Sequence, residues 1–243
     1  MSAGRAISGA ARAIGAGLGD LLAPPSCAGC GEPIPRRRAF CEECELALLE
    51  CDPARCAGCG AEGSRQGLCR ACRLRLRPLA GVFCGFTYEG PLREALQAFK
   101  YQGRDDLGPL LAARWVEALS PPRRLLSRSP LVAPVPLHVR RLRRRGYDQA
   151  WLLARVLARR LRLTPEARLL CRVRETRAQV GLSRPDREKN VRGAFVALPA
   201  AGRPVLLVDD VFTTGATMKA AAEALRRAGS GPVYGFAVAQ ALE

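Results

Sequence analysis

The sequence predicts an α/β protein whose main body is a mostly parallel β-sheet with helices on both faces, preceded by a small cysteine-rich module. Three observations carry this prediction. Four apolar residues at Val205–Val208 lead into two acidic residues, a small-residue turn and an Ala-rich stretch, which is typical of a buried parallel strand, a loop and a helix. The cysteines recur mostly in pairs at fixed spacing. The length of 243 residues, 48% of them hydrophobic, allows one sizeable domain and one small domain.

Residues 1–23 are rich in Ala and Gly and lead into Pro24 and Pro25. A secretory signal is one interpretation, but glycines and Asp20 interrupt the apolar stretch. We therefore expect a partly helical N-terminal arm. Since no apolar run approaches the roughly 18 residues that a membrane helix needs, we also expect no membrane span.

Residues 24–78 carry a repeated cysteine pattern that predicts a double zinc ribbon. A Cys-x-x-Cys turn points two thiolates at one centre, and two such turns complete a closed, structural zinc site. Disulfides would need an oxidising compartment, and redox Cys-x-x-Cys motifs usually occur singly. We predict two zinc ions per chain, a reducing cytoplasmic location, and sequential grouping of the ligands, with an interleaved cross-brace as the alternative. The predicted ligands are Cys27, Cys30, Cys41 and Cys44 for one ion, and Cys56, Cys59, Cys69 and Cys72 for the other.

The basic run Arg73–Pro78 is interpreted as a linker to the main domain, residues 79–243. Alternation and helical spacing of apolar residues predict the elements that follow. They are a strand at 82–88, helices at 91–101 and 107–119, a loop at 121–128, a buried strand at 131–137 and a helix at 150–163. The segment 179–195 is polar and turn-rich, and by itself it indicates a mobile loop that leads into a short strand.

The most basic segment of the chain lies between the predicted strand at 131–137 and the helix at 150–163. A loop in that place lies at the carboxyl edge of an open α/β sheet, where ligands bind. Guanidinium groups contact pyrophosphate with two parallel hydrogen bonds, so we predict an anion-binding role, in contact with either pyrophosphate or DNA. A merely solvated basic run, or a nucleic-acid patch with no small ligand, is the alternative. The candidate residues are Arg140, Arg141, Arg143, Arg144 and Arg145. His138, the single histidine, is assigned no catalytic role.

The acidic pair and the turn after it predict a site for a phosphorylated ribose. Asp209 and Asp210 can accept hydrogen bonds from vicinal hydroxyl groups, while backbone N–H groups at a helix start attract a phosphate. An ordinary strand–turn–helix with capping side chains is the alternative. The predicted phosphate-binding residues are Thr213, Thr214, Gly215, Ala216 and Thr217.

A net charge of +17 and a pI of about 10.3 favour polyanionic partners, either nucleic acid or a phosphorylated substrate. Aromatic residues make up only 5% of the chain. Base-stacking platforms would therefore be sparse, and any nucleic acid would be held mainly through its backbone.

The acidic pair followed by Thr-Thr-Gly-x-Thr resembles the signature of type I phosphoribosyltransferases, which bind phosphoribosyl pyrophosphate (PRPP), usually with Mg²⁺. Nearly the whole chain resembles the ComF family, which joins zinc ribbons to this type of domain. The matching segments are Pro24–Cys30, Tyr88-Glu-Gly90 with Lys100, Val135–Leu137, Arg144–Gln149, and the set Gln179, Leu182, Arg187 and Asn190. The resemblance implies a type I phosphoribosyltransferase fold.

Membership of that family implies cytoplasmic handling of single-stranded DNA during natural transformation, alongside DNA-uptake or recombination proteins. The alternative is an enzyme or PRPP sensor that acts on an unidentified small-molecule acceptor. No residue of the sequence stands out as a base that would activate such an acceptor. A zinc-stabilised scaffold with a vestigial pocket is a third hypothesis.

Overall fold

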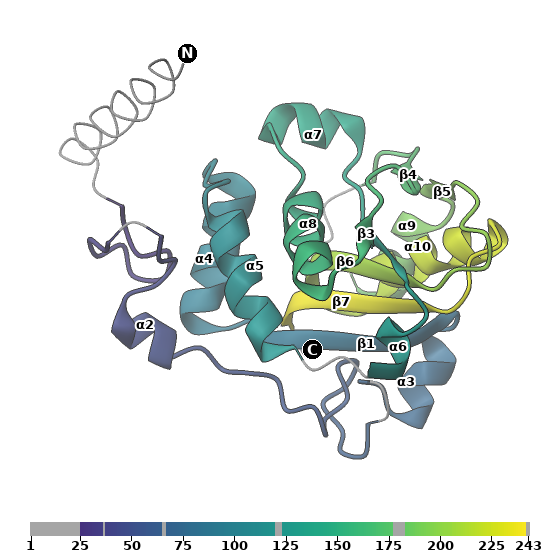
Figure 1. Ribbon diagram of the computed structural model, residues 1–243, viewed down its shortest axis with the longest axis horizontal. Helices are drawn as coiled ribbons and strands as arrows, with labels where there is room; N and C mark the ends of the chain where they lie inside the picture. Colours follow the sequence, from purple (N-terminus) through teal and green to yellow (C-terminus); the bar gives the residue numbers. More distant parts are fainter. Residues whose placement is uncertain (1–24, 36, 65–66, 120–122, 177–182, 242–243) are drawn as a thin grey trace, which may run out of the picture.

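The computed structural model describes residues 25–35, 37–64, 67–119, 123–176 and 183–241 of the 243-residue chain. Its main feature is a five-stranded sheet in the order β1-β7-β6-β2-β3, in which every neighbouring pair is parallel. Helices cover both faces of this sheet (Figure 1). The predicted α/β fold is therefore confirmed. The strands are β1 (Leu79–Thr87), β2 (Leu131–Pro134), β3 (Thr164–Pro165), β6 (Val205–Phe212) and β7 (Val233–Gln240), and a separate antiparallel pair is formed by β4 (Leu170–Arg172) and β5 (Phe195–Ala197).

The two faces of the sheet pack against different helices because side chains alternate along each strand. Leu206 and Val208 of β6 belong to one buried cluster, whereas Val205 and Leu207 belong to the other. The first cluster contains α4 (Gly90–Tyr101), α5 (Leu107–Ala118) and α8 (Gln149–Leu161); the second contains α10 (Ala216–Arg227), beside which lies α9 (Arg184–Val191). Strand β6 is thus buried on both sides, as its continuous apolar sequence predicts.

The two cysteine repeats lie on opposite faces of the sheet. The first includes the short helix α2 (Glu42–Leu46) and shares a buried cluster with α4 and α5. The second includes α3 (Arg70–Arg75) and shares its cluster with α10. Figure 1 shows α2 on the side of α4 and α3 below β1. The predicted linker at 73–78 is wrong: α3 extends to Arg75, and Leu76 is buried with 1% of its surface exposed.

Two further segments predicted as loops contain helices. The basic run forms α7 (Val139–Arg145), because the His138 ring nitrogen accepts the Arg140 N–H and Gly146, with a φ of 84°, ends the helix in the left-handed region. Helix α6 (Arg123–Leu126) lies within the predicted loop 121–128. The remaining predicted helices and strands are confirmed, with shifts of a few residues at their ends.

The polar segment at 179–195 also departs from the expected loop. Ser183 caps α9 by accepting the N–H of Asp186, and Pro185 lies in the first turn, where a proline is compatible with a helix. The short strand expected after it is β5. Gln179 and Leu182 lie outside the described residues.

The predicted N-terminal arm, residues 1–23, also lies outside the described residues. Within the part of the chain that the structure describes, no helix is both long enough and apolar enough to cross a bilayer. The division between a module at 24–78 and a domain at 79–243 stays a prediction.

Candidate functional site

A cavity of about 490 Å³ opens at the carboxyl edge of the parallel sheet. Asp209 and Asp210 contribute to its lining from β6, and Val135 and Pro136 contribute from the segment after β2. Helices α4 and α7 complete it from one side with residues such as Lys100 and Arg141. The carboxyl edge of an open α/β sheet is the usual place of a ligand site, and most of the predicted site residues meet around this cavity, called the carboxyl-edge pocket below.

The phosphate loop, residues Thr213–Thr217, turns from β6 into α10. Gly215 has a φ of 80° and stands immediately before the first residue of α10, so the loop needs the left-handed conformation that glycine allows. Thr213 and Thr217 line the pocket. Thr214 is buried, and its hydroxyl group accepts the Ala216 N–H at 3.4 Å. The loop therefore offers two threonine side chains and a helix N-terminus to an anion.

The two acidic residues alternate along β6, and among the described residues only Asp210 forms an ion pair with Lys100. Asp210 shares the side of Val208 and forms an ion pair of 2.9 Å with Lys100 at the end of α4. Burial disfavours the charged form of Lys100, but the Asp210 carboxylate outweighs this effect, so the pKa of Lys100 is raised. Asp209 has no such partner at hydrogen-bond distance among the described residues, and its Oδ1 accepts the Asp210 N–H at 2.9 Å.

The environment of Asp209 favours its protonated form. Burial and the neighbouring Asp210 raise the pKa of Asp209 to about 8, although Lys100 and Arg172 act in the opposite direction. A carboxyl group of this kind can both donate and accept hydrogen bonds near neutral pH.

The five predicted arginines of α7 divide into two groups. Arg141 and Arg145 are half-buried and line the pocket. Arg141 also donates to the Thr176 carbonyl at 2.6 Å, and the Arg145 guanidinium lies 5.4 Å from the centre of the Tyr101 ring. The other three, Arg140, Arg143 and Arg144, are exposed. Arg140 forms an ion pair of 2.8 Å with Glu175. A single helix thus presents guanidinium groups both to the pocket and to the outer surface.

Three further cations line the pocket: Lys100, Arg172 and Arg187. They were not among the candidate site residues of the sequence, in which Lys100 and Arg187 appeared only as matching positions of the family resemblance. Arg172 lies in β4 with its guanidinium 5.3 Å from the Phe195 ring, and burial lowers its pKa. No local motif marks Arg172, because the chain brings it to the pocket only through the separate β4–β5 pair.

The segment Tyr147-Asp148-Gln149 fixes the end of α4, where Lys100 lies. The Tyr147 hydroxyl and the Gln149 amide both donate to the Phe99 carbonyl. The Tyr147 and Phe99 rings stack with their centres 5.7 Å apart. Asp148 caps α8 by accepting the N–H of Trp151 at 3.0 Å. This segment therefore holds the backbone next to Lys100, and its residues Asp148 and Gln149 also line the pocket.

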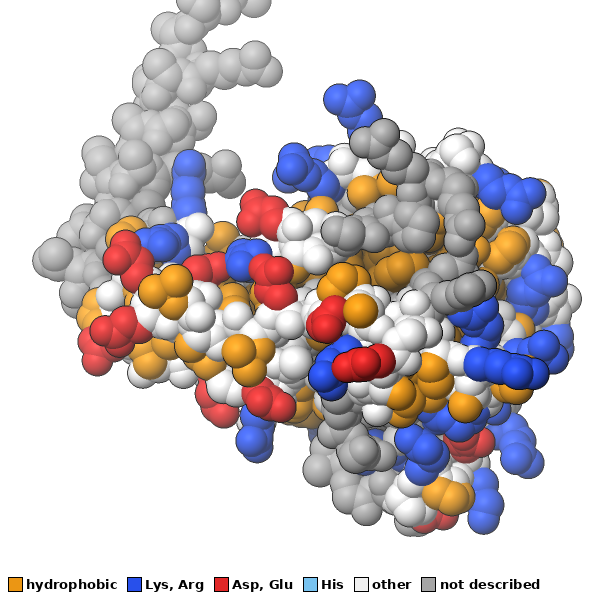
Figure 2. All heavy atoms as spheres, turned by 90° about the horizontal axis from the view of Figure 1, so that it is seen from below, with side chains coloured by type: hydrophobic (Ala, Val, Ile, Leu, Met, Phe, Trp, Pro, Cys, Tyr) orange, Lys and Arg blue, Asp and Glu red, His pale blue; other side chains and the backbone are white. Residues whose placement is uncertain are grey.

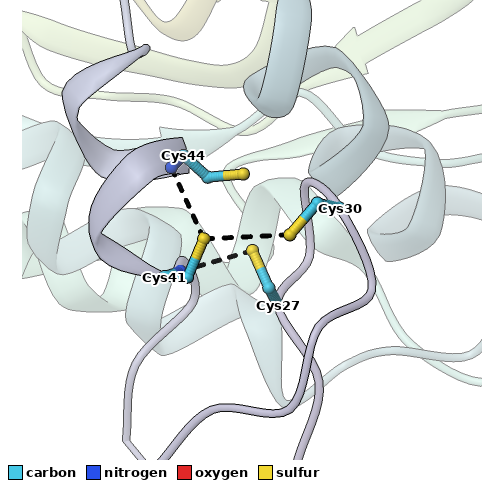
Figure 3. A group of neighbouring side chains, drawn as sticks. All are labelled: Cys27, Cys30, Cys41 and Cys44. Carbon is cyan, nitrogen blue, oxygen red and sulfur yellow. Dashed lines mark hydrogen bonds between the residues drawn. The ribbon is translucent and has the colours of Figure 1, made fainter.

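The first cysteine cluster, Cys27, Cys30, Cys41 and Cys44, has the geometry of a four-thiolate metal site (Figure 3). Its four sulfur atoms lie within 4.8 Å of one another, with Cys30 and Cys41 3.8 Å apart. Tetrahedral zinc with Zn–S bonds of about 2.3 Å places its sulfurs about 3.8 Å apart. The donor set and its spacing therefore fit zinc.

The second cysteine cluster, Cys56, Cys59, Cys69 and Cys72, repeats this geometry with Cys59 and Cys69 also 3.8 Å apart. Corresponding backbone N–H groups donate to sulfur in both clusters: those of Gly29, Cys41 and Cys44 in the first, and those of Gly58, Cys69 and Cys72 in the second. The thiols are grouped sequentially and not as an interleaved cross-brace. A tight turn follows the first cysteine pair of each cluster, where Gly31 and Gly60 have φ values of 84° and 72°.

Two of the thiols are prepared for the thiolate form that metal binding requires. Burial raises the pKa of Cys27, but the backbone N–H groups of Cys30 and Cys41 reverse this effect and lower it to about 6. The Cys72 N–H is the main cause that lowers the pKa of Cys69 to about 7. Thiolates, rather than thiols, ligate zinc, so these N–H groups favour metal binding.

These features define a class of protein: a parallel α/β core with a polar pocket at its carboxyl edge and two four-cysteine metal-binding clusters. No family model matches the chain, but several characterised proteins are similar. DNA utilization protein YhgH of Escherichia coli (strain K12) is 30% identical over 234 residues, which cover 91% of this chain and 100% of that protein. Competence protein F of Haemophilus influenzae is 35% identical over 160 residues, covering 63% of this chain and 70% of the relative.

Competence protein ComFC of Bacillus subtilis is 28% identical over 200 residues, covering 78% of each chain. The similarity to the full length of YhgH, together with the two cysteine clusters, shows that this chain belongs to the ComF family.

Proposed function

We propose that this protein binds PRPP or a related ribose 5-phosphate in the carboxyl-edge pocket and handles single-stranded DNA in the cytoplasm during natural transformation. The observation that carries the ligand is that Asp209, Asp210 and two threonines of the phosphate loop line one pocket together with Arg141 and Arg145. These groups suit, in turn, the diol, the 5-phosphate and the pyrophosphate of the ligand.

In this proposal the acidic pair holds the ribose hydroxyls, while Thr213, Thr217 and the N-terminus of α10 hold the 5-phosphate. Arg141 and Arg145 contact the pyrophosphate through paired N–H groups. Mg²⁺ prefers oxygen ligands and would be held by the oxygens of the pyrophosphate that it accompanies.

The outer surface and the relatives support the DNA part of the proposal. Arg143 and Arg144 are exposed on α7 and are not among the residues that line the pocket. Figure 2, which views the molecule from below and so from the side away from α7, shows basic side chains along the right-hand edge and acidic side chains mainly at the left and centre. The relatives carry names that refer to DNA utilization and competence. DNA-uptake or recombination proteins are the partners that this role would need.

Calorimetric titration of PRPP and of ribose 5-phosphate into the zinc-loaded protein tests the ligand. Losing a charge-assisted hydrogen bond costs roughly 1.5–3 kcal/mol, so Asp209→Asn/Asp210→Asn should weaken binding by about ten- to hundred-fold. Asp105→Asn, a change at an exposed aspartate outside the pocket lining, is the control. Equal binding by the double variant, or none by the wild type, contradicts the ligand assignment.

A phosphoribosyltransferase or PRPP sensor with a small-molecule acceptor is the second candidate. It is favoured by the part of the pocket lined by Tyr88, Gln97 and Tyr101, which the proposed ribose contacts leave available. In a transfer reaction the C1–O bond of the ribose breaks and pyrophosphate leaves, and the arginines would neutralise the departing charge. Release of pyrophosphate that depends on an added acceptor would identify this activity.

A further inference from the structure

We propose that Arg75 couples the second cysteine cluster to the phosphate loop. Metal bound in this cluster then raises the affinity of the loop for a phosphorylated ribose. The proposal rests on the proposed function, because it assigns a positioning residue to the same site. Arg75 itself lies outside the pocket lining. Its effect would therefore be transmitted through the backbone of the loop.

The guanidinium group of Arg75 joins the two sites directly. One nitrogen, Nη1, donates to the Thr214 carbonyl at 3.1 Å, and the other, Nη2, donates to the Cys72 sulfur at 3.5 Å. A trans peptide points its carbonyl and the following N–H in opposite directions. Holding the Thr214 carbonyl toward the cysteine cluster therefore aims the Gly215 N–H away from that cluster and fixes the first peptide of the anion-binding turn.

The residue after Arg75 makes a second connection between the cluster and the loop. Leu76 is buried, and its Cδ2 lies 2.7 Å from the position that a Cβ on Gly215 would occupy. Leu76 and Cys72 belong to the same buried cluster as Phe212 and Met218, which flank the loop. The second cysteine repeat thus supports the loop by packing as well as by hydrogen bonding.

Among the described residues, the first cysteine repeat has no equivalent connection to the phosphate loop. Arg75 is the third residue after the last cysteine of its repeat, and the corresponding residue of the first repeat is Ala47. The first cluster also packs on the opposite face of the sheet, with α4 and α5. The arginine is therefore a specific feature of the second repeat and not a general feature of the metal-binding turn.

The connection has a thermodynamic consequence. If order in the second cluster increases the loop's affinity for its ligand, the ligand must increase metal retention in that cluster by the same factor. Ribose 5-phosphate or PRPP should therefore raise the equilibrium affinity of the second cluster for zinc, measured in competition with a chelator. The ion in the first cluster should be unaffected.

The test compares the zinc-loaded full-length protein with three variants. Arg75→Ala removes the connection, and Arg75→Lys keeps the charge but cannot bridge two acceptors with a planar fork. Arg70→Ala, at an exposed position of the same helix, is the matched control. Hydrogen–deuterium exchange of the 212–218 segment measures the loop without ligand, a zinc indicator with chelator measures metal release, and calorimetry measures PRPP affinity.

We expect faster exchange in the loop and about ten-fold weaker PRPP binding in both Arg75 variants, the loss typical of one charged hydrogen bond. Protection of one zinc ion by PRPP should disappear in these variants, while Arg70→Ala should behave like the wild type. Unchanged exchange and metal release in Arg75→Ala, or full rescue by lysine, would overturn the proposal. If the wild type binds no ribose phosphate, the proposed function fails, but loop exchange still decides the role of Arg75.

Discussion

At the scale of single residues, the alternation of β6 explains why two adjacent aspartates have different environments. Asp210 follows Leu206 and Val208 on the α4 side of the sheet and reaches Lys100 there. Asp209 points to the other side. Besides Lys100, the cation that acts to lower its pKa is Arg172. One aspartate is thus paired in the fold, and the other is held with a raised pKa.

The raised pKa of Asp209 predicts a pH-dependent stability. The folded protein keeps the proton up to about pH 8, whereas the unfolded chain releases it near pH 4, so this residue lowers the free energy of unfolding as the pH rises between these values. Asp209→Asn should remove the effect. It should stabilise the protein more at pH 8.5 than at pH 6, by about 1–2 kcal/mol after allowance for solvent screening in the pocket.

Chemical denaturation at the two pH values measures this difference. The exposed Asp105→Asn variant should show the same change at both values. A stabilisation by Asp209→Asn that is equal at pH 6 and pH 8.5 would contradict the raised pKa.

At the scale of elements, α7 places Arg141 and Arg145 in the pocket lining and leaves Arg143 and Arg144 exposed, which separates the two proposed anion contacts. Arg141/Arg145→Ala should strongly weaken PRPP binding because these side chains line the pocket. Arg143/Arg144→Ala should weaken the binding of single-stranded DNA of every sequence. It should also flatten the slope of log affinity against log salt concentration by up to about 1.4, because each neutralised phosphate contributes about −0.7. Calorimetry with PRPP and fluorescence anisotropy with labelled oligonucleotides measure both ligands on both variants.

The alternative outcome is equally informative. If Arg143/Arg144→Ala leaves DNA affinity and its salt slope unchanged, the outer side of α7 is not the DNA contact. If the variant loses PRPP affinity instead, Arg143 and Arg144 contact the pyrophosphate together with Arg141 and Arg145.

The turn between β6 and α10 predicts a difference between two glycines with similar backbone angles. Gly215 and Gly103 have φ values of 80° and 70°, but only Gly215 has a close neighbour where a Cβ would lie. Gly103→Ala should cost about 1 kcal/mol for the left-handed conformation, whereas Gly215→Ala should cost about 2–4 kcal/mol because Leu76 and Phe212 must also move. Equal losses in urea denaturation would show that Leu76 does not support the loop.

The comparison of sequence with structure separates local from long-range information. The strand at β6, the turn after it and the grouping of the cysteines were predictable because their signals lie within a few residues. The helix α9 was missed although Ser183 and Asp186 form a capping signal. The contacts of Lys100 with Asp210 and of Arg75 with Thr214 join segments that are far apart in the sequence, and no local pattern specifies them.

At the scale of the whole molecule, the two cysteine repeats stabilise opposite faces of one sheet. Metal removal should therefore affect the entire fold and not only the N-terminal segment. Elemental analysis should find about two zinc ions per chain, and chelation under reducing conditions should lower the melting temperature, because binding energy of a structural zinc site contributes directly to folding. A metal-free reduced protein with unchanged stability would contradict the two sites.

The central claim is that the carboxyl-edge pocket binds a phosphorylated ribose through the acidic pair and the phosphate loop. A crystal structure of the zinc-loaded protein with PRPP tests this claim most directly. The account predicts the ribose hydroxyls on Asp209 and Asp210, the 5-phosphate at Thr213–Thr217 and the pyrophosphate toward Arg141 and Arg145. A ligand bound elsewhere, such as on the exposed arginines of α7, or a ribose turned away from the acidic pair would contradict it.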